Sequence, residues 1–301
     1  MDVSSQAMSG GYGRPPASYR LPPATCLGAV ELQVSHLARS LEYYQQLLGL
    51  SVLAHDDHTA SLAAVETTEP VVVLREVAGT RPVTPGSRLG LYHFAILLPD
   101  RSAMGRFITH LSKIGTRTGS SDHLVSEALY LQDPDGLGIE VYVDRPRDAW
   151  RRDNQELLMA SNPLDLDDLV RVAQGAPWTG MPSDPVIGHV HLHVGDLAAA
   201  DAFYAEGLGF DRMVWRYPGA LFLGAGGYHH HLGTNTWASG AVAPRELDAK
   251  LMVWTLVLPT AVDVTELRAH LVSRGLSLTD EPTGILVADP WGTPVRMRAR
   301  G

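Results

Sequence analysis

The chain has 301 residues, of which 45% are hydrophobic and 19% charged, and its formal net charge is −9. This composition is typical of a soluble globular protein with a large core, and the acidic balance argues against a nucleic-acid partner. Cys26 is the only cysteine, so no intrachain disulfide can form. We find no apolar run of about 18 residues and no secretory leader, which predicts no membrane association and a cytoplasmic location.

Residues 1–24 are rich in Ser, Gly and Pro and lack a periodic apolar pattern, which predicts a flexible leader. A strand is predicted over 27–34. A helix follows from Leu37 to the stop at Gly49, and three strand-like runs lie between 51 and 77. Together these elements make one β-α-β-β-β unit.

A second unit begins with a predicted strand over 91–99 and a helix over about 102–114. Its last two strands flank the turn Asp133-Pro134-Asp135-Gly136. Residues 146–184 carry Pro, Asp, Arg and Trp with one short helical pattern at 164–173, which predicts a linker between two halves.

The second half repeats the first at a constant offset of 160 residues, as Leu37 with Leu197 and Tyr44 with Tyr204 show. The turn at Asp133 is repeated, with a small change of offset, as Asp289-Pro290-Trp291-Gly292. Because chance rarely holds one offset through a strand, a helix and its cap, the sequence predicts an α+β fold of four βαβββ units. The units are expected to form an N-terminal module over 25–145 and a C-terminal module over 185–301.

Histidines are concentrated in the third unit. His189, His191 and His193 alternate with aliphatic residues on a predicted strand, so their imidazoles share one face. A second cluster follows as Tyr228-His229-His230-His231. Imidazole binds metals and carries protons near neutral pH, which favours a functional site. The alternative is a polar outer face of the sheet, although such faces are usually built from Lys, Glu and Thr.

Three motifs occur together in this chain: Gly188-His189, the stretch from Gly227 to His231, and Tyr130 ten residues before Glu140. Together they resemble the vicinal oxygen chelate superfamily, and within it the catechol 2,3-dioxygenase-like two-module branch. The resemblance covers about residues 25–300. It implies two vicinal-oxygen-chelate modules with mixed, curved sheets.

One departure from the family pattern concerns the metal ligands. The best-known extradiol enzymes take a first-strand His from each unit of the C-terminal module and a Glu from its last strand. Here His189 is present, but Val253 stands in place of the second His and Arg296 in place of the Glu. Neither residue can ligate iron.

The second unit carries the missing residue types. His93 stands at the position equivalent to Val253 and Glu140 at the position equivalent to Arg296, whereas the first unit has Ala29 where the third has His189. We therefore expect units two and three to pack together across the module boundary. His93, Glu140 and His189 would then form one metal site, unless they are packed or solvated strand residues.

The resemblance implies an extradiol dioxygenase of aromatic compound catabolism that binds a small aromatic diol and O2. Two imidazoles and one carboxylate suit non-haem Fe(II), and Mn(II) fits the same ligands. His230 matches the family's acid–base histidine, and His229 and His231 are expected on the opposite side of a strand. Tyr130 matches the tyrosine that hydrogen-bonds a substrate oxygen. His123 and His191 are weaker candidates for the pocket.

Two other functions stay open from the sequence. A glyoxalase-type metal-dependent lyase or isomerase would be favoured by a second carboxylate near the metal; none is evident, although Glu31 is a possible donor. A metal-free protein that sequesters a small molecule or confers drug resistance would not need His93, His189 or Glu140, which are all present. The substrate, the choice of metal and the formation of a homo-oligomer are left open.

Overall fold

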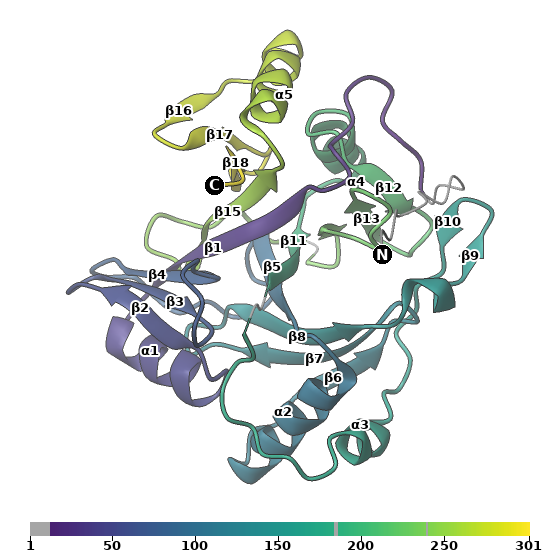
Figure 1. The fold of residues 1–301 in the computed structure, drawn as a ribbon. Coiled ribbons are helices and arrows are strands. Elements are labelled where there is room, and N and C mark those ends of the chain that lie inside the picture. Colours follow the sequence, from purple (N-terminus) through teal and green to yellow (C-terminus); the bar gives the residue numbers. More distant parts are fainter. Residues whose placement is uncertain (1–12, 184–185, 239) are drawn as a thin grey trace.

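The computed structural model describes residues 13–183, 186–238 and 240–301, and two eight-stranded sheets form its centre (Figure 1). Each sheet joins two β-α-β-β-β units, one from each half of the chain. We call the sheet of units two and three the middle-unit sheet and the sheet of units one and four the terminal-unit sheet. The predicted α+β fold of four repeated units is confirmed.

The middle-unit sheet has the strand order β12-β13-β14-β11-β5-β8-β7-β6. At its centre β11 is antiparallel to β5, and β5 is parallel to β8, so the sheet is mixed. Its strands are β5 (Gly90–Leu97), β6 (Gly119–Asp122), β7 (Ser126–Gln132), β8 (Gly138–Asp144), β11 (Val186–His193), β12 (Asp211–Val214), β13 (Ala220–Gly224) and β14 (Leu232–Asn235).

The terminal-unit sheet has the order β16-β17-β18-β15-β1-β4-β3-β2, again with an antiparallel pair from two different units, β1 and β15, at its centre. Its strands are β1 (Cys26–Val34), β2 (Ser51–His55), β3 (Thr59–Ala63), β4 (Val72–Glu76), β15 (Lys250–Leu258), β16 (Thr279–Glu281), β17 (Gly284–Ala288) and β18 (Pro294–Ala299).

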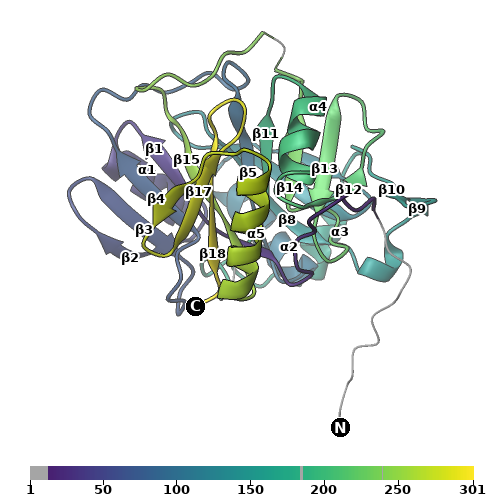
Figure 2. The ribbon, with the colours of Figure 1, turned by 90° about the horizontal axis from the view of Figure 1, so that it is seen from above.

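Helices cover the sheets and begin at side-chain caps. The Asp100 side chain accepts a hydrogen bond from Ala103 N, and Thr260 and Asp263 form a capping box. Figure 2 shows α5 beside β18, and α4 lies near β14. The helices are α1 (Leu37–Gln46), α2 (Arg101–Lys113), α3 (Leu166–Val172), α4 (Leu197–Ala200), which continues as a π-helical turn (Asp201–Ala205), and α5 (Ala261–Ser273).

The segment between the halves contains more structure than the sequence predicts. The short helix expected there is α3, which packs against α2. A 3-10 turn (Arg147–Ala149) and a small hairpin of β9 (Arg152–Asp153) and β10 (Glu156–Leu157) precede it. Strands of two residues leave no periodic pattern, so this hairpin cannot be predicted from periodicity.

The strand order confirms that unit two pairs with unit three. The register also confirms the equivalence of positions in the two sheets: Ala95 on β5 lies opposite Glu140 on β8, and Thr255 on β15 lies opposite Arg296 on β18. His93 and Val253 each lie two residues before these pairs, on the same face of the strand.

The repeated turns explain two of the repeated tyrosines. Asp133 Oδ1 accepts the N–H groups of Asp135 and Leu137, which closes the turn. The hydroxyl of Tyr44, on α1 of the first unit, donates to Asp133 Oδ2 of the second unit over 3.3 Å. Tyr204 donates in the same way to Asp289 over 2.8 Å. Each repeated tyrosine therefore forms a hydrogen bond to a repeated turn, and these two hydrogen bonds connect the two sheets.

Residues 13–24 belong to the predicted leader and lie against the C-terminal half of the chain. Arg20 forms a two-pronged ion pair with Asp211 at 2.7 Å for each hydrogen bond, and Leu21 N donates to Gly209 O. Leu21 is buried. Residues 1–12, the rest of that prediction, lie outside the described part of the chain.

The largest apolar cluster includes strands of both sheets, with Trp254, Tyr44 and Phe94 among its largest buried side chains. Since β1 contacts β11 and β15 contacts β5, the two sheets share this core. Within the described ranges, none of the helices is both long and apolar enough to cross a bilayer.

Candidate metal centre

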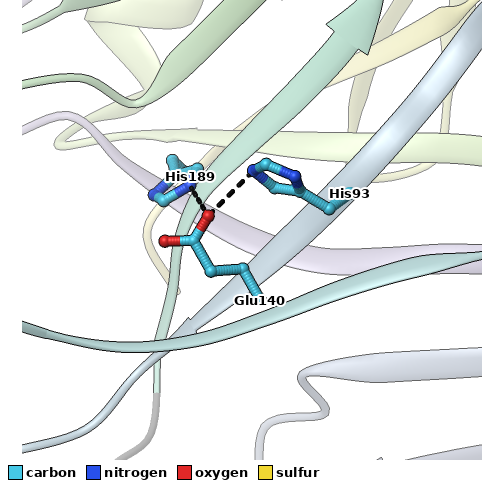
Figure 3. A group of neighbouring side chains, drawn as sticks. All are labelled: His93, Glu140 and His189. Carbon is cyan, nitrogen blue, oxygen red and sulfur yellow. Dashed lines mark hydrogen bonds and ion pairs between the residues drawn. The ribbon is translucent and has the colours of Figure 1, made fainter. Parts of the chain in front are cut away.

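Three buried side chains converge on one face of the middle-unit sheet (Figure 3). His93 projects from β5, Glu140 from β8 and His189 from β11, and their ligand atoms all lie within 4.8 Å of one another. Glu140 Oε2 lies 3.0 Å from His93 Nε2 and 3.3 Å from His189 Nε2. The structure thus brings together three residues that are far apart in the sequence.

Local sequence permits this convergence. β5 lies between β8 and β11, so its inward residues sit between those of the other two strands. A side chain at Gly188 would overlap the Tyr142 hydroxyl, so glycine is required immediately before His189. The pairing of β11 with β5 also shifts register between Ile187 and His189, a bulge that re-aims the histidine.

The polar atoms of this cluster lack enough protein partners. Glu140 Oε1 and the Nδ1 atoms of His93 and His189 are buried, and none has a hydrogen-bond partner among the described residues. Glu140 is only 2% exposed. A buried carboxylate with an unpaired oxygen is costly unless a cation compensates it, so the donor set fits a metal ion.

The protonation states also suit a cation. Burial lowers the pKa of His93, which keeps its imidazole neutral with a lone pair to offer. Burial by itself would raise the pKa of Glu140, but His189 and His93 beside it hold that pKa well below its usual range. Neutral imidazole and ionised carboxylate are the forms that bind metals.

A cavity of about 280 Å³ opens over these three side chains. Its other walls are mostly aromatic or imidazole rings, among them Tyr92, His123, Tyr130, His191, Tyr217, Phe222, His230 and Trp237. A second cavity of about 550 Å³, lined by both sheets, shares Tyr92, His93 and Tyr130 with the first.

Tyr130 and His123 form a hydrogen-bonded pair at the edge of the first cavity. Tyr130 lies directly opposite Glu140 in the pairing of β7 with β8. His123 Nδ1 lies 2.7 Å from Ala160 O and so must donate to it, which leaves His123 Nε2 to accept from the Tyr130 hydroxyl at 2.5 Å. Burial raises the pKa of Tyr130 well above its ordinary value, so the phenol is neutral.

His191 and His193 are held by one asparagine that sequence reasoning missed. His193 Nδ1 donates to Asn235 Oδ1 at 2.7 Å, and Asn235 Nδ2 donates to His191 Nε2 at 2.9 Å. Burial lowers the pKa of both imidazoles. Because its Nε2 lone pair is engaged, His191 lines the cavity without offering that atom to a ligand.

His230 also lines the cavity, and its ring centroid lies 4.2 Å from that of His189. The expectation that His229 points to the opposite side of a strand is wrong. Residues 225–231 form a turn ahead of β14 and not a strand, so side chains do not alternate there. His229 Nδ1 therefore reaches His230 Nδ1 at 2.7 Å, and His229 Nε2 reaches Asp144 Oδ1 at 2.8 Å.

Comparison with known proteins gives the chain a family. The family model of the Glyoxalase/Bleomycin resistance protein/Dioxygenase superfamily matches residues 27–141 and 186–295. The chain belongs to this superfamily.

A relative, the catechol-2,3-dioxygenase of Bacillus subtilis (strain 168), is 41% identical over 270 residues, which cover 88% of this chain and 94% of the relative. Among solved structures, a Bacillus subtilis protein is similar with a TM-score of 0.63 and 12% identity, over 94% of this chain and 86% of the other. Glyoxalase I of Zea mays is similar with a TM-score of 0.54 and 17% identity, over 92% of each chain. These structures share the superfamily's fold.

The terminal-unit sheet has no such donor set at the equivalent place. Ala29 and Val253 offer no ligand atoms there, and Arg296 forms ion pairs of 2.5 Å with Glu31 and Glu281. Glu31 is therefore engaged in ion pairs of the terminal-unit sheet and is not part of the three-residue cluster, so the structure gives it no role as a second carboxylate donor. Where units one and four pair, ion pairs of Arg296 with Glu31 and Glu281 therefore occupy the position that corresponds to the three-residue cluster.

Proposed function

We propose that this protein is an extradiol dioxygenase that opens the ring of a catechol-like diol with O2, using an iron(II) ion held by His93, Glu140 and His189. The observation that supports it most strongly is the buried group of two imidazoles and one carboxylate at the floor of an aromatic-lined cavity. The 41% identical relative is named as a catechol-2,3-dioxygenase, which agrees with this reading.

The donor set favours Fe(II) among redox-active metals. Two histidines and one carboxylate that occupy one side of a metal leave positions open for further ligands, as in non-haem Fe(II) oxygenases. When bound, the ion would supply a redox-active centre at which a diol and O2 meet. Mn(II) accepts the same donors, so activity of the Fe(II)-loaded and the Mn(II)-loaded protein must be compared to identify the metal.

The size and walls of the cavity favour a small aromatic substrate. Its volume of about 280 Å³ lies just below the usual range for small-molecule pockets, which suits a small ligand. Phe222, Tyr92 and Trp237 offer apolar ring surfaces to an aromatic ring. Tyr92 and Trp237 are partly exposed, at 38% and 46%, and so lie where a ligand would enter.

His230 is suited to move the substrate's proton. Burial lowers the pKa of His230 well below its ordinary value, so the imidazole is neutral and can accept a phenolic proton. Tyr130 donates its own proton to His123, so its oxygen is available to accept a hydrogen bond from the diol. His230 would therefore take a proton from the diol, while Tyr130 would hold the diol by accepting a hydrogen bond from it.

The glyoxalase-type lyase or isomerase remains the second candidate. Members of that type activate a neighbouring pair of oxygens at a metal without consuming O2. Within the described ranges the three-residue group contains one carboxylate, whereas that chemistry favours a second. Oxygen consumption separates the two functions.

The test begins with anaerobic purification and loading with Fe(II), Mn(II) or no metal. Catechol is then added, followed by air-saturated buffer, and absorbance in the visible range and O2 uptake are recorded. A yellow ring-fission product with one O2 consumed per catechol supports the proposal. Activity only with Mn(II) would show that the metal is manganese and not iron. Tight catechol binding without O2 uptake in any metal form would refute the dioxygenase function.

A further inference from the structure

A chain of hydrogen bonds connects His230 to the surface of the protein. His230 Nδ1 lies 2.7 Å from His229 Nδ1, and His229 Nε2 lies 2.8 Å from Asp144 Oδ1. His229 is fully buried, whereas the Asp144 side chain is 27% exposed. The chain joins two units of the middle-unit sheet, because Asp144 ends β8 and the histidines precede β14.

The chemistry of each partner sets the direction of these hydrogen bonds. A carboxylate only accepts, so His229 Nε2 must carry the proton in its contact with Asp144. In a neutral imidazole the other nitrogen then holds a lone pair, so His229 Nδ1 accepts from His230 Nδ1. His230 is thereby left with its lone pair on Nε2, an atom with no hydrogen-bond partner among the described residues.

Rings around His229 hold it in place for this contact. Tyr228 packs on it with centroids 4.2 Å apart, and Trp150 meets it edge-on at 5.3 Å. The Tyr228 hydroxyl also donates to Asp144 Oδ1 over 3.3 Å and lies 2.6 Å from the Tyr142 hydroxyl. The Tyr228 hydroxyl and His229 Nε2 thus both donate to Asp144 Oδ1, so this one oxygen holds both side chains in place.

We propose that Asp144 and His229 are positioning residues that fix His230 in the tautomer whose Nε2 lone pair faces the cavity. This inference rests on the proposed function for its role in ring cleavage. The tautomer matters because Nε2 is the atom that can accept the diol's proton, and an imidazole with hydrogen on Nε2 would meet the substrate as a donor. Neither residue is among those that line the cavity, so each would act through His230.

The test compares Asp144→Asn, which keeps an acceptor oxygen, with Asp144→Leu, which has similar size and no acceptor. Asp201→Leu is the matched control, since the Asp201 side chain is 32% exposed and pairs with Arg212 away from the cavity. Protein labelled with ¹⁵N-histidine and loaded with diamagnetic Zn(II) is examined by two-bond ¹H–¹⁵N correlation, which distinguishes the two tautomers. Turnover and KM are measured on the Fe(II) forms.

Wild-type protein, Asp144→Asn and Asp201→Leu should show His230 with its proton on Nδ1, and Asp144→Leu should show it on Nε2 or in a mixture. We expect kcat of Asp144→Leu to fall about 10–100-fold, the loss typical for partners that orient a functional imidazole, with KM nearly unchanged. Asp144→Asn should recover most of this loss, which a merely structural role would not predict.

A wild-type spectrum with the His230 proton on Nε2 would overturn the inference, and so would an unchanged tautomer in Asp144→Leu. If Asp144→Leu does not fold, His229→Phe keeps the ring packing but breaks the hydrogen-bond chain, and it should show the same tautomer change and loss of kcat. Absence of ring cleavage in the wild-type enzyme would refute the proposed function, while the tautomer assignment would still be decided by the spectra.

Discussion

Replacement of Glu140 by glutamine should remove metal-dependent stabilisation while leaving the metal-free fold intact. Glutamine has nearly the same volume but cannot carry the negative charge that the two imidazoles flank. In the metal-free protein Glu140 Oε1 already lacks a partner, so loss of the charge removes a buried, incompletely paired group. The free energy of unfolding without metal should therefore change by no more than about 1 kcal/mol.

The metal-bound comparison gives the larger effect. A ligand at 100 times its Kd stabilises the folded state by about 2.7 kcal/mol, which raises the Tm of a 301-residue protein by roughly 4 °C. Wild-type protein should show this rise with Mn(II) or anaerobic Fe(II), and Glu140→Gln should show almost none. Calorimetry with and without metal, and metal content after gel filtration, measure both quantities.

Arg296→Ala is the matched control, because Arg296 occupies the equivalent position in the terminal-unit sheet. This variant loses ion pairs to Glu31 and Glu281, so its Tm should be lower throughout. Its metal-dependent rise should nevertheless equal that of the wild-type protein. A full rise in Glu140→Gln, or its loss in Arg296→Ala, would show that the metal binds elsewhere.

Three further predictions concern individual residues. His230→Phe should keep its metal but lose about 10²–10⁴-fold in kcat, and a metal-free variant would instead indicate that His230 is a ligand. Tyr130→Phe should lower kcat/KM by roughly 2–10-fold, as expected for one hydrogen bond, and unchanged rate and affinity would remove Tyr130 from the site. Burial lowers the pKa of His231 from 6.5 to about 3, so the unfolded chain binds a proton in this range that the folded protein excludes. Stability should fall by about 1.4 kcal/mol per pH unit as pH drops from 6.5 towards 3, and urea titrations of His231→Gln should show a smaller decline. An equal decline in that variant would assign the acid sensitivity to other groups.

Repetition in the sequence determined the architecture. The offset between Leu37 and Leu197, or Tyr44 and Tyr204, is a property of the chain that tertiary contacts do not alter. Strand alternation and the turns at Asp133 and Asp289 depend on a few neighbouring residues, and patterns of that kind are readable directly. The pairing of unit two with unit three also followed, because only those units carry ligand-type residues at equivalent positions.

Tertiary structure alone decided what surrounds those positions. Asp144 and Asn235 are ordinary polar residues at strand ends. Their partners His229, in a turn, and His191, on another strand, are distant in the sequence, so no spacing along the chain signals these contacts. The same reason explains the wrong expectation for His229, since a turn breaks the alternation that the sequence suggested. Periodicity specifies the face from which a side chain leaves a strand. The hydrogen bonds that select its protonated nitrogen depend on which distant segments fold against it.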